Sequence, residues 1–321
     1  MKVVVVGVGA LGTIVAAHLS RAGHDVTALA RGRRAALIEQ DGLTVRGLAD
    51  LNVACAVLDD PAEIPDAELL IITVKTYDNE QALATIPQRK FGCVFSVANG
   101  VLKNAQLAER FGKDVVLGCM ANTSGELLDN GEVRFTRNVC LHLGELAGGL
   151  STRATAIAQA IDASGITTKP EQDISVIEWS KFVGWTALFA LSVTTRFTTG
   201  SLLSEPNCAW LAAGMINEMA EIAKGNGIRI TDQSPVPVAS VAAAPRERGQ
   251  EILMELGNEW LRTAPDHRMS SLQDLERGKP LEVEGTLGFA VTESHRLGIS
   301  APSLATFYTL VAGINSALRR A

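Results

Sequence analysis

The sequence predicts an α/β domain with a parallel sheet, followed by an all-helical domain. The first supporting observation is the run Val3–Val6, whose consecutive β-branched residues are typical of a strand buried on both faces. The second is the alternation of strand-like and helix-like segments, which continues from this run to about Lys169. The third is that mostly helical patterns follow. These observations divide the chain into residues 1–170 and 171–321.

The elements of the first domain follow from apolar spacing and from the glycines between them. We expect helices at 13–22 and 34–40, and strands at 25–30, 43–45, 53–57, 68–74 and 93–97. The segment 68–74 (ELLIITV) is apolar almost throughout, as in a strand buried on both faces. In the second domain, the apolar run 174–193 is expected to be a helix.

Composition and charge are those of an ordinary globular protein. The chain has 321 residues, of which 47% are hydrophobic and 20% charged, enough for two domains with real cores. A net charge of −6 argues against a nucleic acid or an anionic membrane as the main partner. The N-terminal apolar run lacks a cleavage site, and no long uninterrupted apolar run predicts a transmembrane helix. We expect a cytoplasmic protein.

The cysteines are scattered, without a CxxC pair and without clustered histidines. This spacing fits reduced thiols rather than a disulfide framework or a zinc site. Cys93 and Cys119 fall within expected strands, where they would be small core residues. We expect no metal site.

A glycine-rich motif, GVGALG, follows the first strand directly. G-x-G-x-x-G between a strand and a helix is typical of a dinucleotide-binding domain of the Rossmann type. Gly7 allows the tight turn, Gly9 lets the backbone approach a pyrophosphate, and Gly12 lets the helix pack on the strand. Amide groups at the helix start, at Ala10 and Leu11, would hold the anion. The alternative is a glycine turn without a ligand.

The residue at the end of the second strand bears on which dinucleotide is bound. Where an NAD enzyme carries an acid for the ribose hydroxyls, this sequence has Arg31, followed by Arg33 and Arg34. A guanidinium can clamp a 2′-phosphate with paired charge-assisted hydrogen bonds, whereas a carboxylate would repel it. We therefore expect NADP(H), bound through Arg31. Arg33 and Arg34 are expected to begin a solvated helix.

Polar residues follow two later strands where those strands end. Lys75 comes after the strand at 68–74, and Asn99-Gly100 comes after the strand at 93–97. Ligands bind beyond the carboxyl ends of the strands in open α/β sheets, so both side chains are candidates for a site. Position alone leaves it equally open that Lys75 is a surface lysine and Asn99 a turn former.

Three motifs together give the sequence a specific resemblance. GVGALG, TVKTYD around Lys75 and ANGV around Asn99 resemble the ketopantoate reductase (2-dehydropantoate 2-reductase) family. The resemblance implies that Lys75 and Asn99 line the nicotinamide end of the cofactor site. Residues 117–144 resemble the last strands of the family's nucleotide domain. Thr123 falls at a position that approaches the cofactor through its backbone.

The second domain opens with Lys181 in an aromatic setting, which has two interpretations. It is either a lysine whose stem crosses apolar surface to reach water or a catalytic acid. EWSKF resembles the family's motif around its catalytic lysine, which implies that Lys181 is the general acid. Hydride delivered to a carbonyl carbon leaves charge on the oxygen, and an ammonium group can stabilise and protonate it.

A second cluster supports the same family. SSLQD at 270–274 and GKPLEVE at 278–284 resemble the family's SxxQD and GxPTEID motifs. They place Ser270 on the substrate-binding serine. They place Glu282 on the glutamate that works beside the lysine at the nicotinamide ribose. A carboxylate near Lys181 would orient its ammonium group.

Three positions depart from the family pattern. One and two turns beyond Lys181, where the family has substrate-binding asparagines, this chain has Trp185 and Phe189. A later polar position, typically asparagine, is Thr199. A site that cannot pair a substrate hydroxyl binds it worse. An oxo compound more apolar or aromatic than ketopantoate is therefore a serious candidate. The segment 231–267 also looks long for the family, as a lid, a dimer contact or a surface insertion.

The resemblance spans nearly the whole chain and implies an NADPH-dependent reductase of a 2-oxo acid or related ketone. If ketopantoate is the substrate, the reaction belongs to pantothenate biosynthesis. Two other functions stay open. One is an NADP-linked dehydrogenase of an apolar or aromatic hydroxy compound, and the other is a non-catalytic NADP-binding paralogue. We expect a small-molecule partner in a cleft between the domains, and apolar helices in the second domain are compatible with a homodimer.

Overall fold

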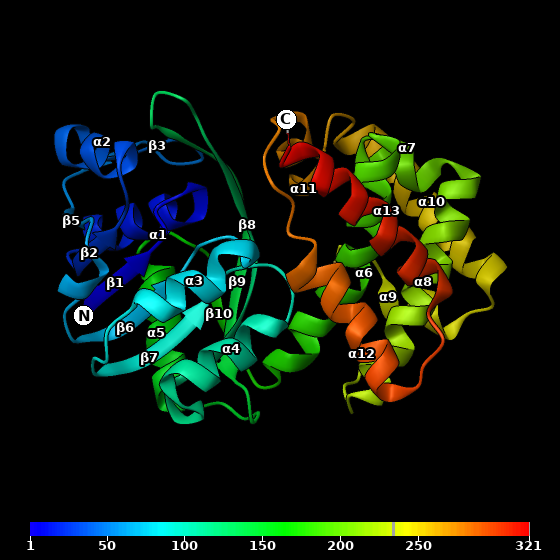
Figure 1. The fold of residues 1–321 in the computed structure, drawn as a ribbon, viewed down its shortest axis with the longest axis horizontal. Helices are drawn as coiled ribbons and strands as arrows, with labels where there is room; N and C mark the ends of the chain where they lie inside the picture. The colour runs from blue at the N-terminus through cyan, green and yellow to red at the C-terminus, as the bar shows by residue number, and fades with distance from the viewer. Residues whose placement is uncertain (233–234, 321) are drawn as a thin grey trace. The chain divides into compact units, whose positions relative to one another are not determined.

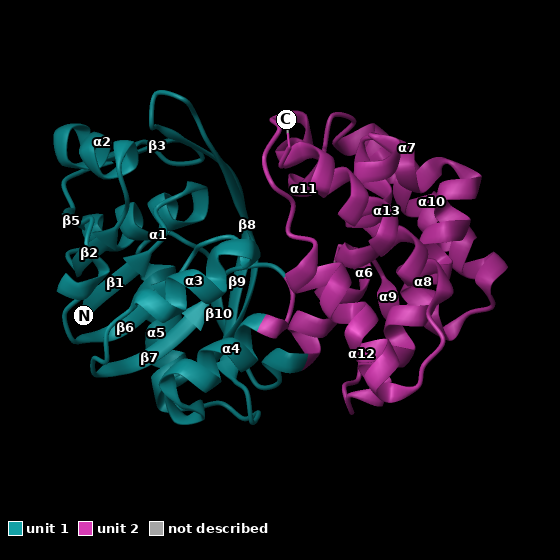
Figure 2. Cartoon of the chain, in the orientation of Figure 1, with its two compact units in different colours: residues 1–99, 103–175 teal, residues 100–102, 176–321 magenta. Residues whose placement is uncertain are grey.

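The computed structural model describes residues 1–232 and 235–320 (Figure 1). The chain forms two units (Figure 2): residues 1–99 with 103–175, and residues 100–102 with 176–321. The first unit is α/β and the second is helical, which confirms the predicted fold class. The short segment Gly100–Leu102 belongs to the second unit, although the residues on both sides of it belong to the first.

A five-stranded parallel sheet forms the centre of the first unit, with strand order β5–β2–β1–β6–β7. Its strands are β1 (Lys2–Val6), β2 (Asp25–Leu29), β5 (Ala56–Leu58), β6 (Ala67–Ile72) and β7 (Phe91–Ser96). Val3 and Val5 belong to one apolar core, and Val4 and Val6 belong to another. Both faces of β1 are therefore covered, which explains why its sequence is apolar without alternation.

The helices of the first unit lie on both sides of this sheet. They are α1 (Ala10–Arg21), α2 (Arg33–Asp41), α3 (Thr76–Thr85), α4 (Leu102–Phe111) and α5 (Thr152–Ala163), with short 3₁₀ turns at Pro61–Glu63 and Lys113–Val115. α1 shares a core with Val3 and Val5, whereas α3 and α4 share one with Val4 and Val6. Because β1 has β2 on one side and β6 on the other, the strand order reverses at its carboxyl end. Open α/β sheets bind ligands at such a point.

A second sheet completes the first unit and corrects one sequence prediction. It contains β3 (Leu43–Gly47), β4 (Leu51–Val53), β8 (Leu117–Leu127), β9 (Val133–Glu145) and β10 (Thr168–Glu171), with β8 and β9 paired as a long antiparallel hairpin. The predicted single strand at 53–57 is wrong. It is two short strands, β4 and β5, which pair in different sheets. Apolar spacing does not reveal that the chain changes sheets at Ala54 and Cys55.

The second unit is built around α6 (Ile174–Thr195). Packed with it are α7 (Thr199–Ser204), α8 (Pro206–Gly225), α9 (Val238–Ala243), α10 (Arg246–Thr263), α11 (Ser270–Glu276), α12 (Phe289–Leu297) and α13 (Pro302–Leu318), with one π turn at Glu284–Gly288. Among the residues that the structure describes, α6 is the one helix long and apolar enough to cross a membrane. However, 83% of its most apolar window is buried, so α6 is the core helix of this unit.

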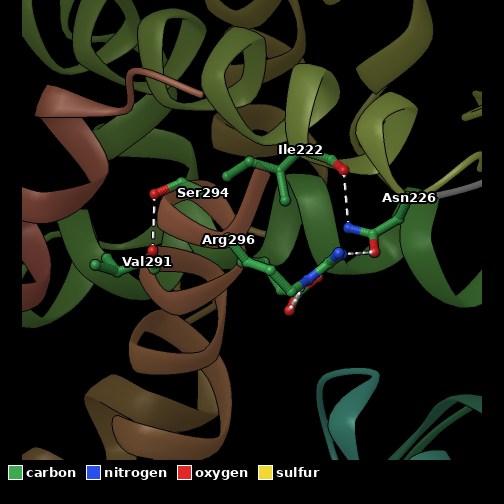
Figure 3. Close-up of polar contacts among 6 residues, drawn as sticks. Ile222, Asn226, Val291, Ser294 and Arg296 are labelled. Atoms are coloured by element: carbon green, nitrogen blue, oxygen red, sulfur yellow. Dashed lines mark hydrogen bonds and ion pairs between the residues drawn. The ribbon is translucent and has the colours of Figure 1, made fainter. Parts of the chain in front are cut away.

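Two further features complete the helical unit. The long segment 231–267 consists mainly of α9 and α10, although residues 233 and 234 lie outside the described part. α10 packs on α7 at Gly257, where a Cβ would meet the backbone of Leu203 and Ser204. The ends of α8 and α12 are joined by Arg296 Nη2, which donates to Asn226 Oδ1 at 2.7 Å (Figure 3).

Candidate active site

The glycine-rich loop lies at the carboxyl end of β1, and two of its glycines are required by close packing. Gly7 has φ +90°, and a Cβ there would lie 2.5 Å from Val74 Cγ1. A Cβ at Gly12 would meet the Gly7 carbonyl oxygen and Thr73 Oγ1. Thr73 also fixes the loop, because its Oγ1 donates to the carbonyl oxygens of Val6 and Gly7. Thr73 lies in the TVKTYD motif, but its role in holding the glycine loop was not predicted.

Gly9 differs from its neighbours because a Cβ there would meet nothing within 4 Å. α1 begins directly after it, without a side-chain cap and without an acidic residue in the first turn. The first amide groups of a helix have no intrahelical partner and carry the positive end of the helix dipole. This open, uncapped helix start, with Ala10 and Leu11 in its first turn, fits the pyrophosphate of a dinucleotide.

One edge of the parallel sheet carries four of the positions that were predicted to bind the cofactor, whereas Thr123 and Glu282 lie elsewhere. Arg31 is exposed just beyond β2, and the glycine loop follows the neighbouring β1. Lys75 is half-buried at the start of α3, just beyond β6, and Asn99 is half-buried just beyond β7. Because these strands are parallel neighbours, the four positions follow one another along a single edge. That is the edge at which such sheets bind nucleotides.

Thr123 lies in β8 at a register shift of the β8–β9 ladder. Its side chain is buried, and its Oγ1 has no hydrogen-bond partner among the described residues. A buried hydroxyl without a partner is uncommon, because leaving it unpaired costs free energy.

Arg34 corrects another sequence prediction. It was expected on a solvated helix face, but its side chain is half-buried and each of its three guanidinium nitrogens donates a hydrogen bond. Nε donates to the Val8 carbonyl oxygen at 2.9 Å, Nη2 to Thr13 Oγ1 at 2.6 Å, and Nη1 to the Gly131 carbonyl oxygen at 2.7 Å. Burial lowers the pKa of this guanidinium. The sequence could not reveal these contacts, because Gly131 belongs to a turn almost a hundred residues away.

Lys103 is a second charged residue that sequence reasoning missed. Its side chain is buried, although it lies near the start of α4. Nζ donates to the carbonyl oxygens of Ala98 at 2.8 Å and Cys119 at 2.6 Å. Lys103 thereby ties the chain just before Asn99 to β8. A lysine in an amphipathic helix is normally solvated, so the sequence carries no signal for this role.

In the helical unit, Lys181 stands out by its exposure. From Val176 to Val193, all of which are described, every residue except Lys181 is buried. Helical spacing places Trp185 and Phe189 on the same side of α6 as the lysine. Their ring centroids are 4.9 Å apart, with the planes inclined at 37°. Trp185 is 8% exposed and Phe189 is fully buried, so Phe189 belongs to the core.

Among the described residues of this unit, two carboxylates are buried. Glu282, which the sequence singled out, is 6% exposed, and Glu178, which it did not, is 4% exposed. Buried carboxylates must be paired or hydrogen-bonded, since an isolated buried charge is very costly. Glu178 lies one turn before Lys181 on α6, at a spacing that makes helix residues neighbours. Its place in EWSKF was the signal that could have identified it.

The remaining predicted substrate residues lie around His267. The amide of Thr199 donates to the His267 carbonyl oxygen at 2.9 Å, and Thr199 Oγ1 lies 2.9 Å from His267 Nδ1. Ser270 is exposed at the start of α11, three residues after this histidine. The next residue, Ser271, is buried with its Oγ 3.4 Å from Ser192 Oγ. Ser192 lies three turns beyond Lys181 on α6, about 16 Å along the helix.

One packing contact connects the sequence after Asn99 with the helix that carries the lysine. Gly100 has φ +77°, and a Cβ there would lie 3.1 Å from the Gly285 carbonyl oxygen and 3.8 Å from Phe182 Cε2. Phe182 directly follows Lys181. The Asn99-Gly100 pair therefore requires glycine at its second position, both for the backbone conformation and for packing within the helical unit.

Comparison with known protein families gives two matches that together cover most of the chain. The model described as "Ketopantoate reductase PanE/ApbA" matches residues 3–148, and the corresponding C-terminal model matches residues 173–315. The chain is 30% identical over 320 residues to a 2-dehydropantoate 2-reductase of Archaeoglobus fulgidus, covering 99% of each chain. It is 25% identical over 313 residues to the 2-dehydropantoate 2-reductase of Pyrococcus horikoshii, covering 97% of this chain and 96% of the relative.

Solved structures show the same fold. A PanE/ApbA family ketopantoate reductase from Ralstonia eutropha is similar with a TM-score of 0.83 at 23% identity, covering 99% of this chain and 100% of the other. A D-mandelate dehydrogenase, solved with NADH and anilino(oxo)acetate, is similar with a TM-score of 0.85 at 17% identity, covering 99% of each chain.

Proposed function

Because the chain belongs to the ketopantoate reductase family, we propose that it is an NADPH-dependent reductase of a 2-oxo acid or a related ketone. The observation that carries the proposal is Lys181. It is a half-buried cation on a helix whose other residues from Val176 to Val193 are all buried. A lysine that is accessible on an otherwise buried helix is suited to proton transfer, because its ammonium group can reach a substrate oxygen, stabilise negative charge there and donate a proton.

The first unit supplies the dinucleotide site of the proposal. The open helix start at Gly9, Ala10 and Leu11 would hold the pyrophosphate, with Gly7 and Gly12 giving the loop its shape. Arg31, exposed beyond β2, would pair with a 2′-phosphate, and this supports NADPH over NADH. Lys75, Asn99 and Thr123 would line the remainder of the site. The bound nicotinamide would supply hydride to the carbonyl carbon of the substrate.

In the helical unit, Lys181 would deliver the proton. Its Nζ would stabilise negative charge on the substrate oxygen and then protonate that oxygen. Glu282 would orient the ammonium group and meet the nicotinamide ribose. Ser270, exposed at the start of α11, would bind the polar end of the substrate, whereas Thr199 is buried with its Oγ1 2.9 Å from His267 Nδ1. Lys181 and Glu282 are both present, which argues against a non-catalytic paralogue.

The aromatic side chains that follow Lys181 on α6 limit the class of substrate in this proposal. Trp185, which is 8% exposed, would offer apolar surface where an amide group would hold the hydroxyl of ketopantoate, with the buried Phe189 packed behind it, and this favours an apolar or aromatic oxo compound. The D-mandelate dehydrogenase structure offers a precedent, since a protein of this fold was solved with the aromatic oxo acid derivative anilino(oxo)acetate. Ketopantoate itself, and with it a place in pantothenate biosynthesis, stays the first alternative because it is the substrate named for the relatives.

A second candidate function runs the reaction in the opposite direction. Trp185 would accept the hydroxy form of an aromatic compound as well as its oxo form, so an NADP-linked dehydrogenase of an aromatic hydroxy compound is the second candidate. Because a proton is consumed in reduction and released in oxidation, the two directions respond oppositely to pH. Rates measured in both directions at several pH values identify the favoured one.

The proposal is tested by turnover of ketopantoate and of phenylglyoxylate, an aromatic 2-oxo acid, with NADPH as the reductant. We expect wild-type protein to turn over at least one at about 1 s⁻¹ or faster. Lys181→Ala should lower kcat by at least about a hundredfold. Lys224→Ala is the matched control, because Lys224 is an exposed lysine of the same unit with 77% of its side chain accessible. Unchanged turnover in Lys181→Ala would rule out Lys181 as the general acid. NADPH binding by the wild-type protein without turnover of either substrate would favour a non-catalytic paralogue.

A further inference from the structure

We propose that Arg34 is a positioning residue that fixes the glycine-rich loop for a dinucleotide and couples this loop to the β8–β9 turn. It touches both segments, through Val8 and Thr13 on one side and Gly131 on the other. The inference rests on the proposed function in one respect: the loop must bind the pyrophosphate of a dinucleotide. It assigns Arg34 a role different from that of Arg31.

On the side of the glycine-rich loop, Arg34 holds two consecutive carbonyl groups, one directly and one through Thr13. Arg34 Nε donates to the Val8 carbonyl at 2.9 Å, and Arg34 Nη2 donates to Thr13 Oγ1 at 2.6 Å. The same hydroxyl donates to the Gly9 carbonyl at 2.7 Å. In a trans peptide, a carbonyl and the amide that follows it point in opposite directions. Holding the Gly9 carbonyl therefore fixes the direction of the Ala10 amide, one of the groups that an anion would meet.

The other side of the network holds the turn between β8 and β9. Arg34 Nη1 donates to the Gly131 carbonyl at 2.7 Å, and Arg33 Nη2 donates to the Asp129 carbonyl at 3.1 Å. Gly131 has φ +89°, and a Cβ there would lie 3.0 Å from Leu37 Cδ1 and 3.3 Å from Arg34 Nη1. The turn therefore packs closely against α2. Motion of the turn away from α2 would break one of the three Arg34 hydrogen bonds.

The planar guanidinium is suited to this role because its donors diverge in a fixed geometry. A lysine carries the same charge, but its donors share one nitrogen, whereas Arg34 meets its three acceptors with three different nitrogens. Arg34 also differs from Arg33, which is exposed and bonds only to the turn in the described contacts. The two neighbouring arginines therefore form a matched pair for mutation.

The test measures the Kd values of NADPH and of NADH for purified wild-type protein and for single variants, by calorimetry. Arg34→Ala should raise both Kd values by about tenfold or more, which corresponds to about 1.4 kcal/mol. Arg31→Ala should raise the Kd of NADPH far more than that of NADH. Arg33→Ala, the control, should change neither value by more than about twofold. Arg34→Lys should lie between Arg34→Ala and the wild type.

Two readouts separate positioning from a purely structural role. Arg34→Ala should raise the KM for the nucleotide while leaving kcat near the wild-type value. Hydrogen exchange should also speed up together in residues 7–12 and 128–132, and addition of NADPH should slow it in both segments of the wild type. In a double-mutant cycle with Thr13→Val, the losses should be less than additive, because Thr13 relays one of the Arg34 contacts.

Three results would overturn the inference. One is an unchanged Kd in a folded Arg34→Ala variant. Another is a loss confined to NADPH, which would make Arg34 a second 2′-phosphate ligand. The third is a wild type that binds neither nucleotide, which would overturn the proposed cofactor as well. If Arg34→Ala does not fold, Arg34→Lys and Thr13→Val decide the question, since both retain most of the packing.

Discussion

The rings of Trp185 and Phe189 lie in contact on α6, with centroids 4.9 Å apart and planes inclined at 37°. They stand one and two turns beyond Lys181, and Trp185 is 8% exposed whereas Phe189 is fully buried. Two aromatic rings therefore follow Lys181 on its side of the helix, and Trp185 is the one that keeps exposed surface. Under the proposed function, Trp185 sets the substrate class.

Replacing Trp185 with asparagine tests that relationship. Trp185→Asn should raise kcat/KM for ketopantoate relative to phenylglyoxylate by about tenfold, because an amide can pair with a hydroxyl that an indole cannot. The variant should also lose about 3 kcal/mol of unfolding free energy through the cavity it leaves. Trp210→Asn on α8 is the control and should leave the substrate ratio unchanged. An unaltered ratio in Trp185→Asn would separate the aromatic pair from substrate choice.

The two glycines Gly9 and Gly12 should respond differently to alanine. Gly9→Ala should fold with near wild-type stability, since a Cβ there meets nothing within 4 Å, but it should bind NADPH about tenfold or more weakly. Gly12→Ala should be destabilised by about 1–3 kcal/mol, because its Cβ would meet the Gly7 carbonyl and Thr73. Thermal unfolding and nucleotide titration of both variants separate the two effects. Equal affinities for Gly9→Ala and the wild type would contradict a pyrophosphate at Gly9.

Lys103→Ala should destabilise the first unit and loosen the chain before Asn99. Without the lysine, the carbonyl oxygens of Ala98 and Cys119 lose the Nζ donor, which lies 2.8 Å from the first and 2.6 Å from the second. Loss of a buried donor costs about 1–3 kcal/mol, to be measured by urea unfolding. Lys113→Ala, an exposed lysine of the same unit, should change stability by less than about 0.5 kcal/mol. Equal stabilities of the two variants would show that the buried ammonium contributes nothing.

His18 makes stability depend on pH. Burial lowers the pKa of His18 below its ordinary 6.5, while its Nδ1 lies 2.9 Å from the Ser164 carbonyl oxygen. The unfolded chain therefore binds more protons below pH 6.5 than the folded one does. The contribution of His18 is fully present above that pH and is lost as the pH falls toward the folded pKa, with a slope of up to about 1.4 kcal/mol per pH unit.

The comparison variant for this prediction is His18→Gln, which cannot be protonated in this range. Its unfolding free energy should fall less steeply than that of the wild type between about pH 6.5 and 5. Burial also lowers the pKa of His24, but this residue is present in both proteins and its effect cancels. Parallel curves for the two proteins would exclude His18 as the source of the pH dependence.

Much of the fold was predictable because it depends on local patterns. The run Val3–Val6, the loop GVGALG and the apolar run of α6 each identify an element by composition and spacing alone. The prediction of a single strand at 53–57 was wrong because a short apolar segment does not specify which strands it pairs with. Its two halves pair with β3 and β2, which lie in different sheets.

The candidate site also has a part that could be predicted from the sequence and a part that could not. Glycines and chain order place Gly7, Gly9 and Gly12 at the end of β1, and the parallel sheet then brings Arg31 and Lys75 to the same edge. Contacts between distant segments were not predictable. The contacts of Arg34 with Gly131 and of Thr199 with His267 depend on how a turn and a loop pack, to which no spacing rule applies.

The division into an α/β part and a helical part, the glycine-rich motif and the motifs of the family can all be read from the amino-acid order. These features are encoded locally, in the periodicity of apolar residues and in glycines that few other residues can replace. Which charged side chains are buried, and which groups they bind, depends on how distant segments pack. Arg34 and Lys103 look like solvated helix residues in the sequence, and they become ties within the nucleotide unit because packing removes them from water and carbonyl groups replace that water.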